Sequence, residues 1–316
     1  MSQPEHSAPA WLRRRGAATA AAFALVSGVI AAGATTAQAS ISVPAAGSQS
    51  AVVWAMTASG RTVPVAKPTF AATPVHPERI THPGRDFMGS TVAPRFAGQR
   101  TITPSTVPQI PGIDVSGYQG NINWASVAPH IDFSYAKATE GTYYTNPDFA
   151  NQYNGPYDSH VIRGAYHFAI PDNSSGQTQA NYFLAHGGGW SGDGRTLPGA
   201  LDIEYNPYGS ECYGLTQSQM VSWIWNFVHQ YAFREHVYPA IYTTTDWWTS
   251  CTGDNGGFGN DDPLWIANYS DSHGGPLPRG WGFYTFWQYR DSGSLPGDQD
   301  VFNGALSRLQ ILAKSG

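Results

Sequence analysis

The chain has 316 residues, a length that allows one large domain or two. Its formal net charge is −5 and only 12% of its residues are charged, so the charge pattern argues against a nucleic-acid-binding protein. Aromatic residues make up 13% of the chain, with 11 Trp and 17 Tyr. Aromatic side chains are first of all core residues, but such an excess also suits a cleft in which sugar rings stack.

The first 39 residues are organised like an export signal. Three arginines, Arg13 to Arg15, precede an Ala-rich and weakly apolar run over residues 16–34, and Ala37-Gln38-Ala39 fits the small-residue cleavage pattern. A transmembrane anchor is the alternative, but a segment this rich in Ala, Gly and Thr inserts weakly into membranes. We therefore expect a signal peptide over residues 1–39, exported by the general secretory or the twin-arginine route. The mature protein is expected to be secreted to the extracellular space or cell wall, with no membrane association.

Residues 40–107 show no sustained hydrophobic periodicity. Prolines recur among Ala, Ser, Thr and Gly, and the only apolar cluster is Val52-Val53-Trp54. Such a stretch buries too little apolar surface to offset the entropy lost on ordering it. It is predicted to be a disordered linker or a pro-segment, which leaves residues 108–316 as the folded domain.

The first half of this domain alternates strands and helices. Short apolar runs predict strands at residues 112–116, 131–137, 161–168 and 198–206. Pro147 stands in the first turn of a helix that runs toward His160. Ser174 or Ser175 can cap a second helix that runs toward His186.

The second half begins with Thr216-Gln217-Ser218-Gln219, which resembles a capping box. The helix that follows has a single apolar stripe made of Met220, Trp223, Ile224, Phe227, Val228 and Tyr231. Further strands are predicted at residues 239–243, 264–268 and 284–288, then an extended piece at 300–302 and a helix from Ala305. This order predicts an α/β fold with a parallel sheet, closed into a compact barrel because there are about eight strands. The connections 268–283 and 288–300 are rich in Gly and Pro, so the late strands are expected to lack helical crossovers.

Two carboxylates follow one another at alternate positions in the run 198–206. Asp202 and Glu204 point to the same face of a strand, with Cα atoms roughly 7 Å apart, while Leu201 and Ile203 point to the other face. Repulsion between like charges and loss of solvent both raise carboxyl pKa values, so the pair suits chemistry in which one acid is protonated and its neighbour ionised. Asp-x-Glu is weak evidence alone, because two exposed acids at a strand end are equally common.

Other acids and aromatic residues are expected at the same place. In a parallel barrel the carboxyl ends of the strands share one face, where chemistry occurs. Asp114 ends the first strand and Asp298 precedes the last extended piece, so both join Asp202 and Glu204 there. The predicted substrate-binding residues are Tyr118, Tyr166, Tyr205, Trp265, Trp287 and Gln288. Since no nucleophile triad and no metal-ligand spacing is present, we expect glycoside hydrolysis without a metal or cofactor.

The chain has two cysteines, Cys212 and Cys251, which suit a disulfide in an oxidising compartment. Two unpaired buried thiols are the alternative. His167 lies within a predicted strand, where a histidine with satisfied hydrogen bonds in the core or cleft is expected rather than a metal ligand.

Six segments in order resemble the signature segments of family 25 glycoside hydrolases, the Chalaropsis-type lysozymes or N-acetylmuramidases. They are Gly112-Ile113-Asp114-Val115-Ser116, Lys137-Ala138-Thr139-Glu140-Gly141, Gly164-Ala165-Tyr166-His167-Phe168, Leu201-Asp202-Ile203-Glu204, Leu264-Trp265-Ile266-Ala267-Asn268-Tyr269 and Trp287-Gln288-Tyr289. The resemblance covers essentially the whole folded domain. It implies a flattened, irregular TIM-like barrel and cleavage of the β-1,4 bond between N-acetylmuramic acid and N-acetylglucosamine in peptidoglycan.

The resemblance also implies roles for the acids. Glu204 corresponds to the general acid, with Asp114, Asp202 and Asp298 as companion carboxylates. The chain departs from the family at Gly117-Tyr118-Gln119, where His-Trp-Gln is usual, and at Asp298-Gln299-Asp300-Val301-Phe302, where Asp-Leu-Asn-Val-Phe is usual. Asp298 aligns with the family's acid, although Asp300 could take its place.

Two other functions stay open at this point: a chitinase acting on N-acetylglucosamine polymers, and a cell-wall-binding module with a dead site. The expected partner is the peptidoglycan polysaccharide, and the expected state is a monomer. Asp-x-Glu also resembles enzymes in which the substrate's own N-acetyl group attacks the anomeric carbon, while direct inversion remains an alternative.

Overall fold

The computed structural model describes residues 53–56, 62–65, 86–92, 107–271 and 273–316. The predicted signal peptide lies outside the described residues. Among the described residues, no helix has the length and apolar character needed to cross a membrane.

The region expected to be a linker or pro-segment contains two described pieces. Strand β1 (Val53–Met56) pairs with β2 (Thr62–Val65) in an antiparallel hairpin. Residues 86–92 form a compact turn in which Ser90 donates its N–H to the carbonyl of Phe87 and Val92 donates to that of Gly89. Met88 and Val92 in this turn are buried. Local sequence does not predict the turn because, as shown below, its order comes from contacts with residues far along the chain.

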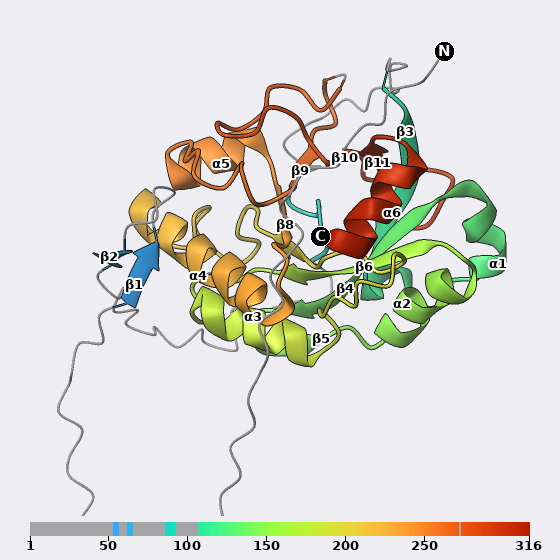
Figure 1. The fold of residues 1–316 in the computed structure, drawn as a ribbon, viewed down its shortest axis with the longest axis horizontal. Coiled ribbons are helices and arrows are strands. Elements are labelled where there is room, and N and C mark those ends of the chain that lie inside the picture. Colours follow the sequence, from blue (N-terminus) through green and yellow to red (C-terminus); the bar gives the residue numbers. More distant parts are fainter. Residues whose placement is uncertain (1–52, 57–61, 66–85, 93–106, 272) are drawn as a thin grey trace, which may run out of the picture. The chain divides into compact units, whose positions relative to one another are not determined.

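Eight strands close into a barrel (Figure 1). Around the barrel, each strand pairs with the next and β3 also pairs with β4: β3 (Gln109–Val115), β11 (Asp298–Asn303), β10 (Phe286–Arg290), β9 (Leu264–Ala267), β8 (Ala240–Thr243), β7 (Ala200–Asp202), β6 (Ile162–Phe168) and β4 (Phe133–Glu140). The short strand β5 (Tyr144–Thr145) extends β4 as an antiparallel pair. The predicted barrel is therefore confirmed.

Strand β11 is the one antiparallel member of the closed barrel. It pairs antiparallel with both β10 and β3, whereas the other neighbouring pairs are parallel. The register aligns Asp298, the first residue of β11, with Asp114 near the end of β3. Because β11 runs backward, its first residue lies at the same end of the barrel as the last residues of the parallel strands. We call this end the mouth.

An aromatic layer fills the barrel interior below the mouth. Its five rings have neighbouring centroids 4.8 to 5.7 Å apart and are contributed by Phe133, Tyr135, Trp265, Phe286 and Phe302. These residues alternate along their strands with residues that point outward. Side chains two positions closer to the mouth therefore also point into the barrel. The layer gives the polar groups above it a rigid, dry floor.

Helices cover the outside of the barrel. They are α1 (Trp124–Val127), α2 (Phe149–Asp158), α3 (Gly176–Ala185), α4 (Gln217–Glu235), α5 (Thr245–Thr252) and α6 (Leu306–Ser315), with short 3₁₀ turns η3 (Gly117–Gln119) and η4 (Ala128–His130). Helices α3 and α4 lie side by side (Figure 1). The capping box at Thr216 is present, and the whole predicted stripe of α4 is buried. No helix occurs among the described residues between β9 and β10 or between β10 and β11, as expected.

Helix α5 was not predicted. Its sequence, Thr245-Asp246-Trp247-Trp248-Thr249-Ser250-Cys251-Thr252, contains residues with low helix propensity. Its N-cap comes from Thr244, whose hydroxyl accepts the N–H of Trp247, and its end from Gly253 in a left-handed conformation. Tertiary burial of both tryptophans then outweighs the weak propensity.

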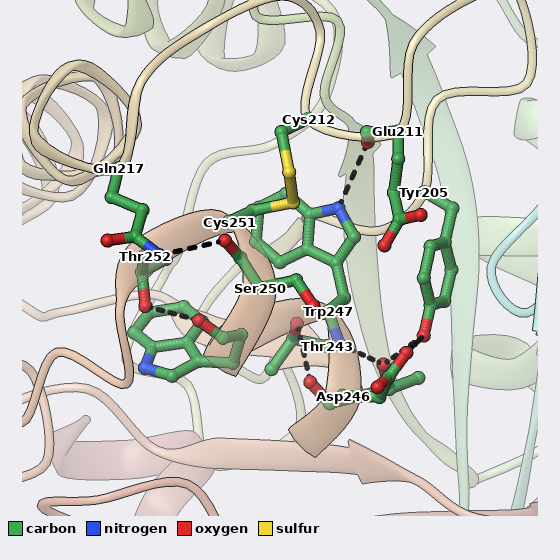
Figure 2. The surroundings of a disulfide bond; sticks show 12 residues. Tyr205, Glu211, Cys212, Gln217, Thr243, Asp246, Trp247, Ser250, Cys251 and Thr252 are labelled. Carbon is green, nitrogen blue, oxygen red and sulfur yellow. Dashed lines mark hydrogen bonds between the residues drawn. A yellow bond between two sulfur atoms is a disulfide. The ribbon is translucent and has the colours of Figure 1, made fainter.

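The predicted disulfide is present between Cys212 and Cys251 and spans 39 positions of the chain. Figure 2 shows that it joins the loop after β7 to helix α5. The Trp247 indole N–H donates to the carbonyl of Glu211, next to Cys212. The Gln217 side chain donates to the carbonyl of Ser250, next to Cys251. The covalent link is thus embedded in hydrogen bonds that fix the same two segments.

Candidate active site

Five buried carboxyl groups gather at the mouth of the barrel. They come from β3, from β7 and the residues just after it, and from β11, and they are Asp114, Asp202, Glu204, Asp298 and Asp300. None is more than 2% exposed, so each has lost nearly all of its contact with solvent. The four acids expected to converge are therefore brought together, and Asp300 joins them.

Gln288 holds two of these acids from β10. Its side-chain N–H₂ donates to Asp114 at 2.7 Å and to Asp298 at 3.1 Å. Its carbonyl oxygen accepts the hydroxyls of Tyr242 at 2.7 Å and Tyr269 at 2.6 Å. Since both ends of the amide are occupied, the orientation of Gln288 is fixed, and so is the separation of the two carboxylates it joins.

Asp202 and Glu204 form the first of two pairs of buried carboxyl groups. Neither carboxyl oxygen of Asp202 has a hydrogen-bond partner among the described residues, and the charge of Glu204 acts on it. Burial, and then the charge of Glu204, raise the pKa of Asp202 well above its ordinary value. This shift favours the protonated form of Asp202.

Glu204 is buried but well supplied with donors. Burial raises its pKa to about 7, against the opposing effect of hydrogen bonds from Thr91 and Gly89. A carboxyl with this pKa exchanges a proton near neutral pH, as a general acid or base must.

Asp114 and Asp300 form the second pair. Burial raises the pKa of Asp114 to about 7, while the hydrogen bond from Gln288 acts against it. Burial, and then the charges of Asp114 and Asp298, raise the pKa of Asp300 well above its ordinary value. The Trp265 indole donates to Asp300 at 3.0 Å from the aromatic layer below. Asp300 therefore lies deeper than Asp298 and acts on Asp114 from beneath.

The segment 86–92 lies directly on Glu204. Gly89 donates its backbone N–H to one carboxylate oxygen at 2.8 Å, and Thr91 donates its N–H to the other at 3.3 Å. The hydroxyl of Thr91 also donates to this second oxygen. Both oxygens of Glu204 are thus occupied by residues more than 110 positions earlier in the chain.

A buried ion pair lies beside the acids at the end of β4. Lys137 contacts Glu140 at 2.6 Å, and both side chains are fully buried. Glu140 also accepts the hydroxyls of Tyr143 at 2.7 Å and Tyr208 at 2.6 Å. Both charged residues belong to the Lys137–Gly141 segment quoted above, but the sequence analysis gave them no role. Their position at the end of a buried strand was the signal that could have identified them.

The six predicted substrate-binding residues divide into two groups. Tyr166, Gln288 and Tyr118 lie at the mouth: Tyr166 accepts the N–H of Met88, Gln288 donates to Asp114, and Tyr118 is 66% exposed with its ring 5.5 Å from that of Phe87.

The other three do not face the site. Trp265 is in the aromatic layer beneath Asp300. Tyr205 is packed outside the barrel and donates to Asp246 at 2.6 Å (Figure 2), and Trp287 is buried outside it and donates to the carbonyl of Asn268. The physical reason is strand alternation: Tyr205 follows Glu204 and Trp287 precedes Gln288, so each points away from its inward neighbour.

His167 is a core residue. Its ring nitrogens are hydrogen-bonded to Thr139 at 2.7 Å and Gln179 at 2.9 Å, and burial lowers its pKa to about 4. It is therefore neutral at physiological pH. Among the described residues, no group of three or more His, Cys, Asp or Glu side chains is arranged to hold a metal ion.

Comparison with known proteins identifies this domain. The model of glycosyl hydrolases family 25 matches residues 113–298, more than half of the chain. Lysozyme M1 of Streptomyces globisporus is 45% identical over 263 residues, covering 78% of this chain and 88% of that protein. The N,O-diacetylmuramidase of a Chalaropsis species is 45% identical over 208 residues, covering 65% of this chain and 99% of that protein. The solved structure of a muramidase from Acremonium alcalophilum, 56% identical, superposes with a TM-score of 0.64 and covers 66% of this chain and all of its own. The chain belongs to family 25 of the glycosyl hydrolases.

Proposed function

We propose that this protein is a muramidase that hydrolyses the β-1,4 bond between N-acetylmuramic acid and N-acetylglucosamine in peptidoglycan. The observation that carries the proposal is the buried pair of Asp202 and Glu204, which face one another at the mouth with Asp114 and Asp298 close by. Relatives named lysozyme or N,O-diacetylmuramidase, 45% identical to this chain, support it.

Glu204 is proposed as the group that transfers the proton. It donates a proton to the glycosidic oxygen as the bond to the leaving sugar breaks, and the resulting carboxylate then accepts a proton from the attacking water. A carboxyl with a pKa near 7 can do both. An ordinary glutamic acid, with a pKa near 4.3, is below about 1% protonated at pH 6.5 and is a poor acid there.

Asp202 is proposed as the group that holds the substrate's acetamido side chain. Its carboxyl oxygens accept no hydrogen bond from any described residue, which leaves them ready to accept the acetamido N–H. The acetamido oxygen then attacks the anomeric carbon as the leaving sugar departs, and the oxazolinium ring that forms carries a positive charge beside Asp202. Transfer of the Asp202 proton to Glu204 supplies the acid and leaves the aspartate ionised next to that charge. Direct inversion would not need an acceptor in this position.

The proposed setting is outside the cell. Residues 1–39 have the pattern of a signal peptide, and the Cys212–Cys251 disulfide is of the kind that persists in oxidising compartments. We propose a secreted, monomeric enzyme that needs no cofactor, with the chain divided at residues 39 and 107 as the sequence suggests.

The test is the release of new reducing ends from peptidoglycan and, in parallel, from chitin. We expect release from peptidoglycan and little from chitin, and we expect Glu204→Gln to lower the rate about 10²- to 10⁴-fold, the usual worth of a general acid–base group. The near-isosteric amide keeps the fold, which circular dichroism and thermal unfolding can verify. A Gln variant that digests cell walls within threefold of the parent contradicts the role of Glu204. Equal or faster digestion of chitin contradicts the substrate.

A further inference from the structure

Residues 86–92 form hydrogen bonds with three side chains of the candidate site, those of Glu204, Tyr166 and Gln288. The N–H groups of Gly89 and Thr91 and the Thr91 hydroxyl donate to Glu204. Met88 donates its N–H to the hydroxyl of Tyr166 at 3.3 Å and accepts from Gln288 at 3.2 Å.

The start of the segment is held separately, at the buried ion pair. Lys137 donates to the carbonyl of Asp86, and the hydroxyl of Tyr208 donates to its side chain. The Phe87 ring lies against Tyr118, the most exposed of the predicted sugar-binding residues. Between these polar contacts, Met88 and Val92 are fully buried among the residues of the barrel interior. The segment is therefore anchored by side-chain contacts along its whole length.

Its position is incompatible with catalysis at Glu204. Both oxygens of this carboxyl are occupied, so neither can approach a glycosidic oxygen. Three hydrogen-bond donors also favour the ionised form of Glu204, which lowers its pKa and withdraws the proton that the leaving sugar requires. The same contacts block access to Glu204 and reduce the fraction of this carboxyl that carries the proton needed for catalysis.

The relatives show that this segment is an addition to the barrel. The Chalaropsis and Acremonium proteins match 65% and 66% of this chain over 99% and 100% of their own length, and residues 109–316 make up about that share of the chain. The match with the Streptomyces protein covers 78% of the chain, about 247 residues, so it must begin before β3 and include residues 86–92. A barrel alone thus accounts for two of the relatives, while the third has sequence corresponding to the segment.

We propose that residues 86–92 are an autoinhibitory element, which binds the catalytic carboxyl of Glu204 in place of peptidoglycan and keeps the full chain inactive until it leaves. The inference rests on the muramidase function proposed above. It also gives the pro-segment interpretation of residues 40–107 a specific mechanism.

Gly89 provides a selective way to displace the segment. Its φ of +90° is one that residues with a side chain rarely adopt, and a Cβ there would lie 2.5 Å from the Tyr269 hydroxyl and 2.6 Å from the Gln288 carbonyl oxygen. Gly89→Ala therefore disfavours the bound segment without changing any group of the barrel. Thr91→Val is the second variant, because it removes one donor to Glu204 at nearly constant volume. Gly282→Ala is the matched control, since a Cβ there meets nothing within 4 Å.

The experiment measures two quantities on the full chain. The first is hydrogen exchange of the amides in 86–92, which does not depend on catalysis. We expect protection in the parent and in Gly282→Ala, and exchange at least about tenfold faster in Gly89→Ala. The second is kcat/KM on peptidoglycan, which should rise at least about tenfold in Gly89→Ala and less in Thr91→Val, because a site that is free only a tenth of the time loses that factor in apparent affinity.

Each outcome bears on a separate claim. Exchange in the parent as fast as in a free peptide overturns the proposal, and so does a parent as active as Gly89→Ala. Protection that is lost in Gly89→Ala, with no hydrolysis by either protein, supports the contact of the segment with the site and contradicts the muramidase function instead.

Discussion

Two pairs of carboxyl groups lie at the mouth of the barrel, and they differ in what surrounds them. Asp202 and Glu204 are consecutive inward positions of one chain segment, and Glu204 lies beyond the last residue of β7, outside the ladder. Asp114 and Asp300 lie within the paired strands β3 and β11 and are fixed by Gln288 and Trp265. The first pair is supported by loops and by segment 86–92, whereas the second is supported by the barrel itself. This contrast supports the proposal that the first pair transfers the proton and the second has a positioning role.

The largest expected effect is at Asp202, in the pair proposed to take part in the reaction. If Asp202 holds the acetamido group, Asp202→Asn removes the negative charge that stabilises the oxazolinium ring and lowers kcat about 10²- to 10³-fold, the usual cost of losing one preorganised electrostatic contact. The loss should be similar at every pH. The measurement is a pH–rate profile on peptidoglycan.

The competing role for Asp202 predicts another profile. If it only tunes Glu204, loss of the neighbouring carboxyl shifts the pKa of Glu204 by about one unit, near 1.4 kcal/mol, and leaves the maximal rate intact. Near-parent activity at a pH optimum shifted by about one unit would contradict the acetamido role. Asp262→Asn is the matched control, because Asp262 is also a buried aspartate without a hydrogen bond to its carboxyl oxygens, but it precedes β9 at the other end of the barrel.

The disulfide ties the loop that follows Glu204 to α5. Removing the disulfide therefore tests whether this loop holds Asp202 and Glu204 in place. Cutting the 39-residue link in Cys212→Ser/Cys251→Ser should destabilise the protein by up to roughly 4 kcal/mol in the chain-entropy model. We expect a marked fall in Tm, because the loop and α5 lose their covalent tie while Trp247 still buries between them. Reduction of the parent should reproduce the shift, and a reductant should have no further effect on the double variant. An unchanged Tm would show that hydrogen bonds alone fix the loop.

The two pairs also differ in how far the sequence predicted them. Alternation along a strand places Asp202 and Glu204 on one face. The common direction of the parallel strands places Asp114 at the same end of the barrel, and Asp298 was expected there as well. Both rules could be applied from the sequence, and both hold here. The same period, applied strictly, would have excluded Tyr205 and Trp287 as partners of Glu204 and Gln288. The stripe of α4 was predicted in full because helical periodicity over nineteen residues leaves one solution.

What the sequence did not predict depends on distant contacts. The turn at 86–92 has no periodic pattern, and its order comes from donors that meet a carboxyl more than 110 positions away. The depth of Asp300 follows from the antiparallel register of β11, which a run of six residues does not encode. Lys137 and Glu140 form an ion pair that becomes recognisable only once β4 is known to be buried over its whole length.

The smallest expected effect on activity is at Asp300. A change there should alter the pH dependence of stability rather than the rate, which would distinguish the second pair from the first. The raised pKa of Asp300 means that the folded protein keeps a proton which the unfolded chain releases above pH 4. Stability contributed in this way is complete below the unfolded pKa and falls as the pH rises toward the folded pKa, by about 1.4 kcal/mol per unit for one proton.

Asp300→Asn removes this titration and keeps the hydrogen bond from Trp265, which the amide oxygen can accept. We therefore expect the difference in Tm between pH 4.5 and pH 8 to shrink, and kcat to stay within about threefold of the parent. Asn is also the residue usual in the family at this place. Asp262→Asn should flatten the stability profile in the same way, because burial raises the pKa of Asp262 too. A loss of activity in Asp300→Asn as large as that in Asp202→Asn, with Asp262→Asn unaffected, would mean that the second pair also takes part in proton transfer.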